Sequence, residues 1–233
     1  MGSMTQAEPK CLVRLGRRTL LERQIESLRG GGCGTIGIVT GYRSGLLEPY
    51  ADRVFHNAVW ETTNMVASLF CAEAWLSAGP VIVSYSDIFY SPQTVRRLID
   101  GRGDAAISFD PDWHDLWSAR AEDPLADAES FKCNADGTLA GIGQKVSRRE
   151  EAEGQFMGLL RFTPSVWPEV KAAVAAQPPE RQQRLDMTSL LALLIGRGVA
   201  IQAVPREGVW GECDTPSDAA LYERWIAEGR LEP

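Results

Sequence analysis

Short runs of apolar, β-branched residues alternate with longer segments of helical periodicity in the first half of the chain. Residues 35–40 (TIGIVT) and 80–86 (PVIVSYS) are too short for helices and rich in valine and isoleucine, which is typical of strands buried on both faces. Residues 19–29 and 64–76 place apolar side chains three and four positions apart, which predicts helices, and the glycines at 30–32 end the first one. Because strands that alternate with helices form βαβ units, the pattern predicts parallel strands with helices on both faces.

The second half of the chain completes this pattern and adds a region of another kind. The remaining predicted elements are a third strand at 104–109, helices at 164–176, 187–197 and 217–228, a surface loop at 178–184 and a strand at 199–204. After Asp110 the alternation is lost, and the pair Asp136-Gly137 is typical of a hairpin turn, so antiparallel strands and loops are expected there. We therefore predict an α/β fold with a doubly wound, mainly parallel, Rossmann-like mixed sheet and a small antiparallel β lid. Residues 1–233 are expected to form a single domain, because no repeat or shift in composition divides them.

The charge balance and the distribution of apolar residues exclude several classes of protein. Acidic residues outnumber basic ones by 31 to 24, whereas proteins that bind nucleic acid concentrate positive charge. No run of about 18 apolar residues is present to span a bilayer, and the first residues lack the apolar core of a signal peptide. The five cysteines form no CxxC pair, which argues against a disulfide framework or a zinc site. We therefore expect a cytoplasmic protein that binds neither nucleic acid nor membranes.

Asp87 is the candidate metal ligand that the strand pattern itself indicates. In open parallel sheets, ligands bind beyond the carboxyl ends of the strands, and Asp87 directly follows the predicted strand at 80–86. A carboxylate there can hold a hard cation such as magnesium, although capping a helix or turn is an equal alternative. Asp214 precedes a Thr-Pro pair that is typical of a helix start, so for Asp214 the cap is the stronger interpretation.

A series of short segments occurs in an order and spacing that is specific to one superfamily. At the N-terminus they are PKCLV at 9–13, LGRRTLLERQ at 15–24 and IVTGY at 38–42. Further along the chain they are ETTNMVASL at 61–69, SDI at 86–88, GQFMGL at 154–159, LDMTSL at 185–190 and WGECDT at 210–215. Together they resemble the MobA-like and sugar nucleotidyltransferase superfamily, and they are most similar to its phosphocholine and phosphonate cytidylyltransferases.

This resemblance implies a fold, a reaction and a cofactor. The fold would be of the nucleotide-diphospho-sugar transferase type, with a nucleotide-binding half at about 1–110 and an acceptor-binding half at about 111–233. The enzyme would be a magnesium-dependent nucleotidyltransferase that joins the nucleoside monophosphate of an NTP, CTP in the first place, to a phosphate or phosphonate acceptor and releases pyrophosphate. The acceptor oxygen is already anionic near neutral pH, so no general base is required. The resemblance leaves a homodimer open.

Roles for individual residues follow from the same resemblance. Lys10 is expected to contact the nucleotide phosphates and to act with Asp87 in catalysis, while Asp87 and Asp214 hold magnesium. The other nucleotide-binding residues that the resemblance implies are Tyr42, Thr63, Asn64, Ser68 and Ser86. Structural alternatives stay open: a solvated surface lysine for Lys10, a core position for Tyr42, and a helix cap and helix face for Asn64 and Ser68.

The acceptor site is expected in the irregular middle of the chain, where aromatic and acidic residues gather. The residues assigned to it are Trp113, Trp117, Glu129 and Gln155. Aromatic faces and carboxylates bind cationic groups, which favours phosphocholine or 2-aminoethylphosphonate over a neutral sugar phosphate. Two alternatives stay open: the tryptophans pack a β-rich lid, and the enzyme is a sugar-1-phosphate nucleotidyltransferase.

The N-terminal sequence departs from the superfamily in one respect. The glycine-rich loop of the superfamily, which wraps the triphosphate through backbone amides, has no counterpart in this sequence. Residues 1–5 (MGSMT) resemble the segment that follows the loop, so we expect either a start site upstream of Met1 or a chain that lacks the loop. Residues 1–3 also match a remnant of an expression vector. A chain without the loop would favour a non-catalytic nucleotide-binding module.

Overall fold

A four-stranded mixed sheet forms the centre of the protein. The computed structural model describes residues 8–233, so the expectations about the N-terminal start, which concern residues 1–7, lie outside the described residues. The sheet has the strand order β11-β7-β10-β5, formed by Ile201–Pro205, Ala105–Asp110, Gln155–Phe162 and Val81–Ser84. β11 is parallel to β7, whereas β10 runs antiparallel to both β7 and β5. The predicted α/β fold with a mixed sheet is confirmed, and β10 is the central strand that the periodicity did not identify.

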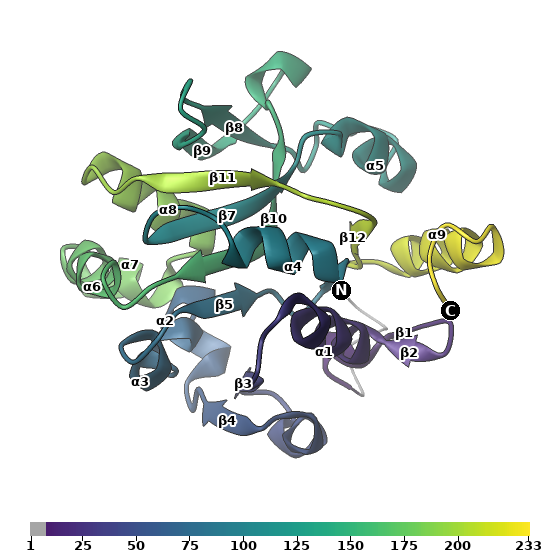
Figure 1. The fold of residues 1–233 in the computed structure, drawn as a ribbon, viewed down its shortest axis with the longest axis horizontal. Coiled ribbons are helices and arrows are strands. Elements are labelled where there is room, and N and C mark those ends of the chain that lie inside the picture. Colours follow the sequence, from purple (N-terminus) through teal and green to yellow (C-terminus); the bar gives the residue numbers. More distant parts are fainter. Residues whose placement is uncertain (1–7) are drawn as a thin grey trace.

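Helices cover both faces of this sheet, as the alternation of strands and helices predicted (Figure 1). α1 (Leu20–Gly31) and α4 (Pro92–Ile99) pack on one face, while α6 (Trp167–Ala175) and α8 (Met187–Gly196) pack on the other. Successive side chains of β7 belong alternately to the two hydrophobic clusters, because neighbouring residues of a strand point to opposite faces. The sheet is therefore buried on both sides, and its strand ends are where loops can form a site.

Shorter elements surround the central sheet. The two-stranded pairs are β1–β2 (Arg14–Leu15, Arg18–Thr19), β3–β4 (Gly37–Thr40, Arg53–His56), β6–β12 (Ile88–Tyr90, Trp210–Glu212) and β8–β9 (Glu129–Cys133, Leu139–Lys145). The remaining α-helices are α2 (Met65–Phe70), α3 (Glu73–Leu76), α5 (Trp113–Arg120), α7 (Pro179–Arg184) and α9 (Pro216–Ala227). The 3-10 turns are η1 (Lys10–Leu12), η2 (Ser44–Leu46), η3 (Glu48–Tyr50), η4 (Trp60–Thr62) and η5 (Arg149–Glu151). Within the described residues, no helix is both long and apolar enough to cross a membrane.

The hairpin β8–β9 is the predicted antiparallel lid. Its turn follows the Asp-Gly signal: Gly137 has a φ of +80°, in the left-handed region that favours glycine. Asp136 Oδ1 accepts the backbone N–H of Thr138 at 2.9 Å, which closes the turn. The hairpin packs against α8, β10 and β11, and it lies beside β11 at the edge of the sheet (Figure 1).

The structure differs from the predicted elements in the segment after β7. Residues 113–120 were expected to belong to strands and loops, but they form the helix α5. Trp113, Leu116 and Trp117 occupy positions i, i+3 and i+4, and all three are buried against the rest of the core. Polar residues surround this short apolar stripe, so its helical periodicity is not recognisable in the sequence. Packing rather than periodicity decides the local structure.

Two further predictions need correction. Residues 178–184 were expected to be a surface loop, but Pro179 begins the helix α7, where its missing N–H is no disadvantage. The strand expected at 35–40 was predicted to be buried on both faces, yet in β3 only Thr40 is fully buried. β3 lies in a two-stranded pair with β4 rather than in the central sheet, so one layer of packing is missing.

Gly158 offers a test of the packing at the end of β5. It has a φ of +73°, and a Cβ there would lie 2.6 Å from the ring of Tyr85. We expect Gly158→Ala to lower the free energy of unfolding by about 1–3 kcal/mol, because the backbone is strained and the ring must move. Urea denaturation followed by tryptophan fluorescence measures this change. Gly141→Ala is the control, since nothing lies within 4 Å of its Cβ position; equal losses in the two variants would contradict the account.

Candidate active site

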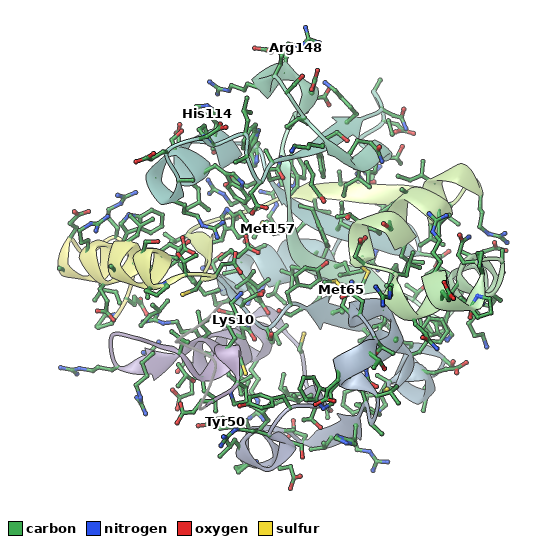
Figure 2. All side chains as sticks on the ribbon, turned by 180° about the vertical axis from the view of Figure 1, so that it is seen from behind. Lys10, Tyr50, Met65, His114, Arg148 and Met157 are labelled. Carbon is green, nitrogen blue, oxygen red and sulfur yellow. The ribbon has the colours of Figure 1, made fainter. Side chains whose placement is uncertain are left out.

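Lys10, Asp87 and Asp214 come together beyond the carboxyl end of β5. Lys10 lies in η1, Asp87 lies in the turn between β5 and β6, and Asp214 lies between β12 and α9. The Lys10 ammonium donates to Asp87 Oδ2 at 2.9 Å and also to Asp214 Oδ1. Lys10 is only 12% exposed, so it is not a solvated surface lysine. In Figure 2 it lies toward the middle of the molecule, well away from His114 and Arg148.

Strand pairing explains why the two aspartates are neighbours. β6 and β12 are antiparallel, with Ile88 opposite Glu212. The next residues of this antiparallel pair are Cys213, which follows Glu212, and Asp87, which precedes Ile88. The Cys213 N–H donates to the Asp87 carbonyl at 2.8 Å. Asp87 and Asp214 are thus held at adjacent ends of one hydrogen-bonded ladder, which places their carboxylates on the same side.

The cap alternatives do not describe these two aspartates. α9 is capped by Thr215, whose hydroxyl accepts the Asp218 N–H at 3.2 Å in a reciprocal capping box. Asp214 stands one position before the cap and turns its carboxylate toward Lys10 instead. Asp87 likewise gives one carboxylate oxygen to Lys10, and neither side chain ends a helix.

Glu212 adds a third carboxylate that the sequence analysis did not assign, although it lies in the WGECDT segment. One carboxylate oxygen from each of Asp87, Glu212 and Asp214 lies within 4.8 Å of the other two. Asp87 Oδ1 is buried and has no hydrogen-bond partner. Carboxylate oxygens are the ligands that magnesium prefers, so this donor set fits a magnesium ion and leaves an oxygen for it.

Arg120 binds the carboxylates of this cluster from the side of α5. Its guanidinium contacts Glu212 Oε2 at 2.9 Å, Asp214 Oδ2 at 2.9 Å and Asp218 Oδ1 at 3.0 Å. The guanidinium carbon lies 5.1 Å from the ring centroid of Trp117, within the range of a cation–π contact. Sequence reasoning missed Arg120, because it stands at the end of a helix that was expected to be a loop.

The charges of the cluster shift its protonation equilibria. Burial raises the pKa of Glu212 to about 7, and the neighbouring charge of Asp214 acts in the same direction against the opposing effect of Arg120. Burial alone would lower the pKa of Lys10, but the charge of Asp87 and the hydrogen bond to Asp214 raise it above its ordinary value. Lys10 therefore stays protonated, while Glu212 resists ionisation.

Tyr42, Thr63 and Ser68, which were assigned to the nucleotide, lie near the ends of β3 and η4 and in α2. The Tyr42 ring lies 5.5 Å from the ring of Trp60, which is 38% exposed. Asn57, which the sequence analysis missed, is 3% exposed and donates to Thr63 Oγ1 at 2.9 Å and to Ser68 Oγ at 3.1 Å. The two hydroxyls are therefore joined through one buried amide, and their role toward a nucleotide stays a prediction.

Asn64 and Ser86 occupy different environments. Asn64 caps α2: its Oδ1 accepts the Met65 N–H at 2.8 Å, and its Nδ2 donates to the Arg184 carbonyl at 3.3 Å. The helix-cap alternative therefore describes the Asn64 side chain. Ser86 is exposed and precedes Asp87 in the turn after β5.

The two tryptophans assigned to the acceptor belong to the hydrophobic core. Trp113 is 2% and Trp117 is 6% exposed. Trp113 Nε1 donates to the Ala152 carbonyl at 3.0 Å, and the Trp117 ring lies 5.9 Å from that of Trp210. The packing alternative describes both side chains, because α5 turns their rings into the core, and a role of either residue toward the acceptor stays a prediction.

Glu129 and Gln155, the other acceptor residues, lie together at the base of the lid. Gln155 donates to the Glu129 carbonyl at 2.6 Å and accepts its N–H at 3.3 Å. Burial raises the pKa of the Glu129 carboxyl, and the charge of Asp186 raises it further. Burial also raises the pKa of Tyr85, with added effects from Asp186 and Asp87. Tyr85 therefore lies within reach of two acidic groups, the cluster around Asp87 and the pair of Glu129 and Asp186.

A solved structure shows the fold class of this protein. The inositol-1-phosphate CTP transferase from T. maritima superposes with a TM-score of 0.72 at 16% identity, over 96% of this chain and 90% of that one. An identity this low establishes the fold alone. The fold is that of the nucleotide-diphospho-sugar transferases, as predicted.

Sequence comparisons assign the chain to one family within this class. Residues 1–130 match the MobA-like NTP transferase domain. The CTP:phosphoglutamine cytidylyltransferase of Campylobacter jejuni is 32% identical over 231 residues, 92% of this chain and 91% of that protein. The bifunctional IPC transferase and DIPP synthase of Rubrobacter xylanophilus is 26% identical over 97% of this chain but only 50% of its own length. The chain belongs to the MobA-like NTP transferase family, and the predicted superfamily is confirmed.

The raised pKa of Glu212 predicts a pH-dependent stability for the metal-free protein. The folded value of about 7 lies above the ordinary 4.5, so the folded protein holds this proton more tightly than the unfolded chain. The resulting stabilisation is fully present below the unfolded value and is lost as the pH rises through 7. Glu212→Gln stays uncharged, so it does not lose this stabilisation. Its free energy of unfolding should therefore rise relative to that of the wild type as the pH increases from 4.5 to about 7. Urea titrations in EDTA at several pH values measure the difference, and a difference that is independent of pH would contradict the assignment.

Proposed function

We propose that the protein is a magnesium-dependent cytidylyltransferase that joins the CMP unit of CTP to a small phosphate or phosphonate acceptor. The observation that carries this proposal is the cluster of Asp87, Glu212 and Asp214 around Lys10, with Asp87 Oδ1 left without a partner. Membership of the MobA-like NTP transferase family supports nucleotidyl transfer. The names of the relatives from C. jejuni and T. maritima support CTP as the nucleotide.

The proposed reaction needs positioning and charge neutralisation rather than proton abstraction. An oxygen of the acceptor forms a bond to the α-phosphorus of CTP, the bond from that phosphorus to the bridging oxygen breaks, and its electron pair leaves with pyrophosphate. The acceptor oxygen is already an anion near neutral pH, so no side chain has to remove a proton. Magnesium, when bound, would neutralise phosphate charge. Asp87, Glu212 and Asp214 would hold it, and the Lys10 ammonium would bind phosphate oxygens.

The acceptor is proposed to carry a cationic group. Glu129 and Asp186 lie close enough for the charge of Asp186 to raise the pKa of the Glu129 carboxyl, and a ligand cation would relieve this repulsion. Phosphocholine and 2-aminoethylphosphonate have such a group, whereas a sugar 1-phosphate does not. Carboxylates alone now support this choice, since Trp113 and Trp117 are in the core.

Pyrophosphate release tests the reaction. We expect release with magnesium and CTP in the presence of phosphocholine, 2-aminoethylphosphonate or phosphoglutamine, and little with glucose 1-phosphate. Asp87→Asn should lower kcat by roughly 100-fold or more, because the buried oxygen that would face the metal loses its charge. Asp100→Asn is the control, since Asp100 is exposed at the end of α4. Nucleotide binding without release for any acceptor would favour the non-catalytic module.

Glu129 tests the acceptor end separately. Glu129→Gln should raise the KM for a cationic acceptor by roughly tenfold and leave the KM for CTP unchanged, because a charge-assisted contact is lost. Glu150→Gln provides an exposed carboxylate in the same region as its control. Steady-state kinetics with each substrate varied in turn gives both constants, and an unchanged acceptor KM would place the cationic group elsewhere.

A further inference from the structure

Gln24 binds the turn that carries Asp87 from the side of α1. Its side chain is buried, with the residue only 5% exposed. Gln24 Nε2 donates to the Tyr85 carbonyl at 2.9 Å and to the Ile88 carbonyl at 2.6 Å. These two carbonyls flank Ser86 and Asp87, so one amide group spans the turn and uses both of its N–H bonds on it.

The same turn is held from its other side by the segment that carries Asp214. The Cys213 N–H donates to the carbonyl of Asp87 itself. Hydrogen bonds to the carbonyls of Tyr85, Asp87 and Ile88 thus hold the backbone around Asp87, while its carboxylate contacts Lys10. Rotation of either peptide in the turn would change the position of the Asp87 carboxylate relative to those of Glu212 and Asp214.

α1 also fixes the segment that carries Lys10. The Leu20 N–H donates to the Val13 carbonyl at 3.0 Å, and Leu21 packs against Cys11, the residue after Lys10. One helix therefore sets the position of both the lysine and the turn of Asp87 relative to each other.

We propose that Gln24 is a positioning residue, which holds the Asp87 carboxylate in the orientation that binds the divalent cation. This inference rests on the proposed function, in which Asp87 is a metal ligand. Gln24 contacts neither substrate nor metal in this scheme; it acts through the backbone of residues 85–88. Groups that orient ligands in this way typically change metal affinity or activity by roughly 10–100-fold when they are removed.

Ser27 provides a matched control on the same helix. Ser27 Oγ donates to the Tyr90 carbonyl at 2.5 Å, at the far end of β6, and the residue is 7% exposed. Like Gln24→Met, which removes two buried hydrogen bonds from a side chain of α1 to backbone carbonyls, Ser27→Ala removes one such bond, to a carbonyl of β6. It leaves the turn of Asp87 untouched, so it reports the purely structural effect of losing such a bond.

The test compares the affinity for Mn²⁺, measured by electron paramagnetic resonance, with kinetics and with Tm. Gln24→Met should weaken Mn²⁺ binding and raise the magnesium concentration for half-maximal rate, each by roughly tenfold or more, with a small change in the KM for CTP. Ser27→Ala should lower Tm comparably and leave both metal constants within about twofold, as expected for a group that orients no ligand. Gln24→Asn keeps an amide that is too short to reach both carbonyls, and it should show the same metal defect if Gln24→Met does not fold.

The outcomes separate this inference from the proposed function. Equal Mn²⁺ affinities and equal magnesium concentrations for half-maximal rate in the Gln24 and Ser27 variants would overturn the positioning role. Gln24 would then be a structural residue. A wild type that releases no pyrophosphate with any nucleotide would refute the proposed function. Mn²⁺ binding that still depends on Gln24 in that case would support the positioning role on its own.

Discussion

The concentration of four carboxylates around two cations is the constraint on which the site depends. Asp87, Glu212, Asp214 and Asp218 surround Lys10 and Arg120, so a fully ionised cluster carries two uncompensated negative charges. Partly buried charges of one sign are costly unless a cation joins them. In the metal-free protein Glu212 lowers this cost because it resists ionisation, whereas the buried Asp87 oxygen without a partner adds a cost that a bound cation would relieve. Both features suit a site that is completed by a divalent cation and a nucleotide.

The fold supplies this arrangement by joining distant segments at one end of the sheet. The ladder of β6 and β12 places Asp87 beside Asp214, η1 brings Lys10 to both, and α5 brings Arg120 from the opposite side. The lid then places Glu129 near Asp186, with Tyr85 within reach of both acidic groups. The charges at the nucleotide end and at the acceptor end of the proposed reaction thus both raise the pKa of Tyr85.

The sequence predicted those parts of the molecule that local patterns determine. The alternating strands and helices, the Asp136-Gly137 turn and the position of Asp87 after an apolar strand all follow from local periodicity and turn chemistry. Asp214 needed the family resemblance, because its surroundings are also typical of a helix start. Arg120, Asn57 and Gln24 were not predictable, since their partners lie far away in the sequence. For Trp113 and Trp117 the sequence left packing open as an alternative, but it did not predict the helix α5 that carries both rings into the core.

The central claim is that the three carboxylates form a divalent cation site, and direct metal binding tests it. Mn²⁺ titration followed by electron paramagnetic resonance, with the wild type and a variant that combines Asp87→Asn with Asp214→Asn, measures the site without relying on turnover. The account predicts one strongly bound Mn²⁺ per wild-type chain in the presence of CTP, and loss of that ion in the double variant. Equal binding by both proteins would contradict it.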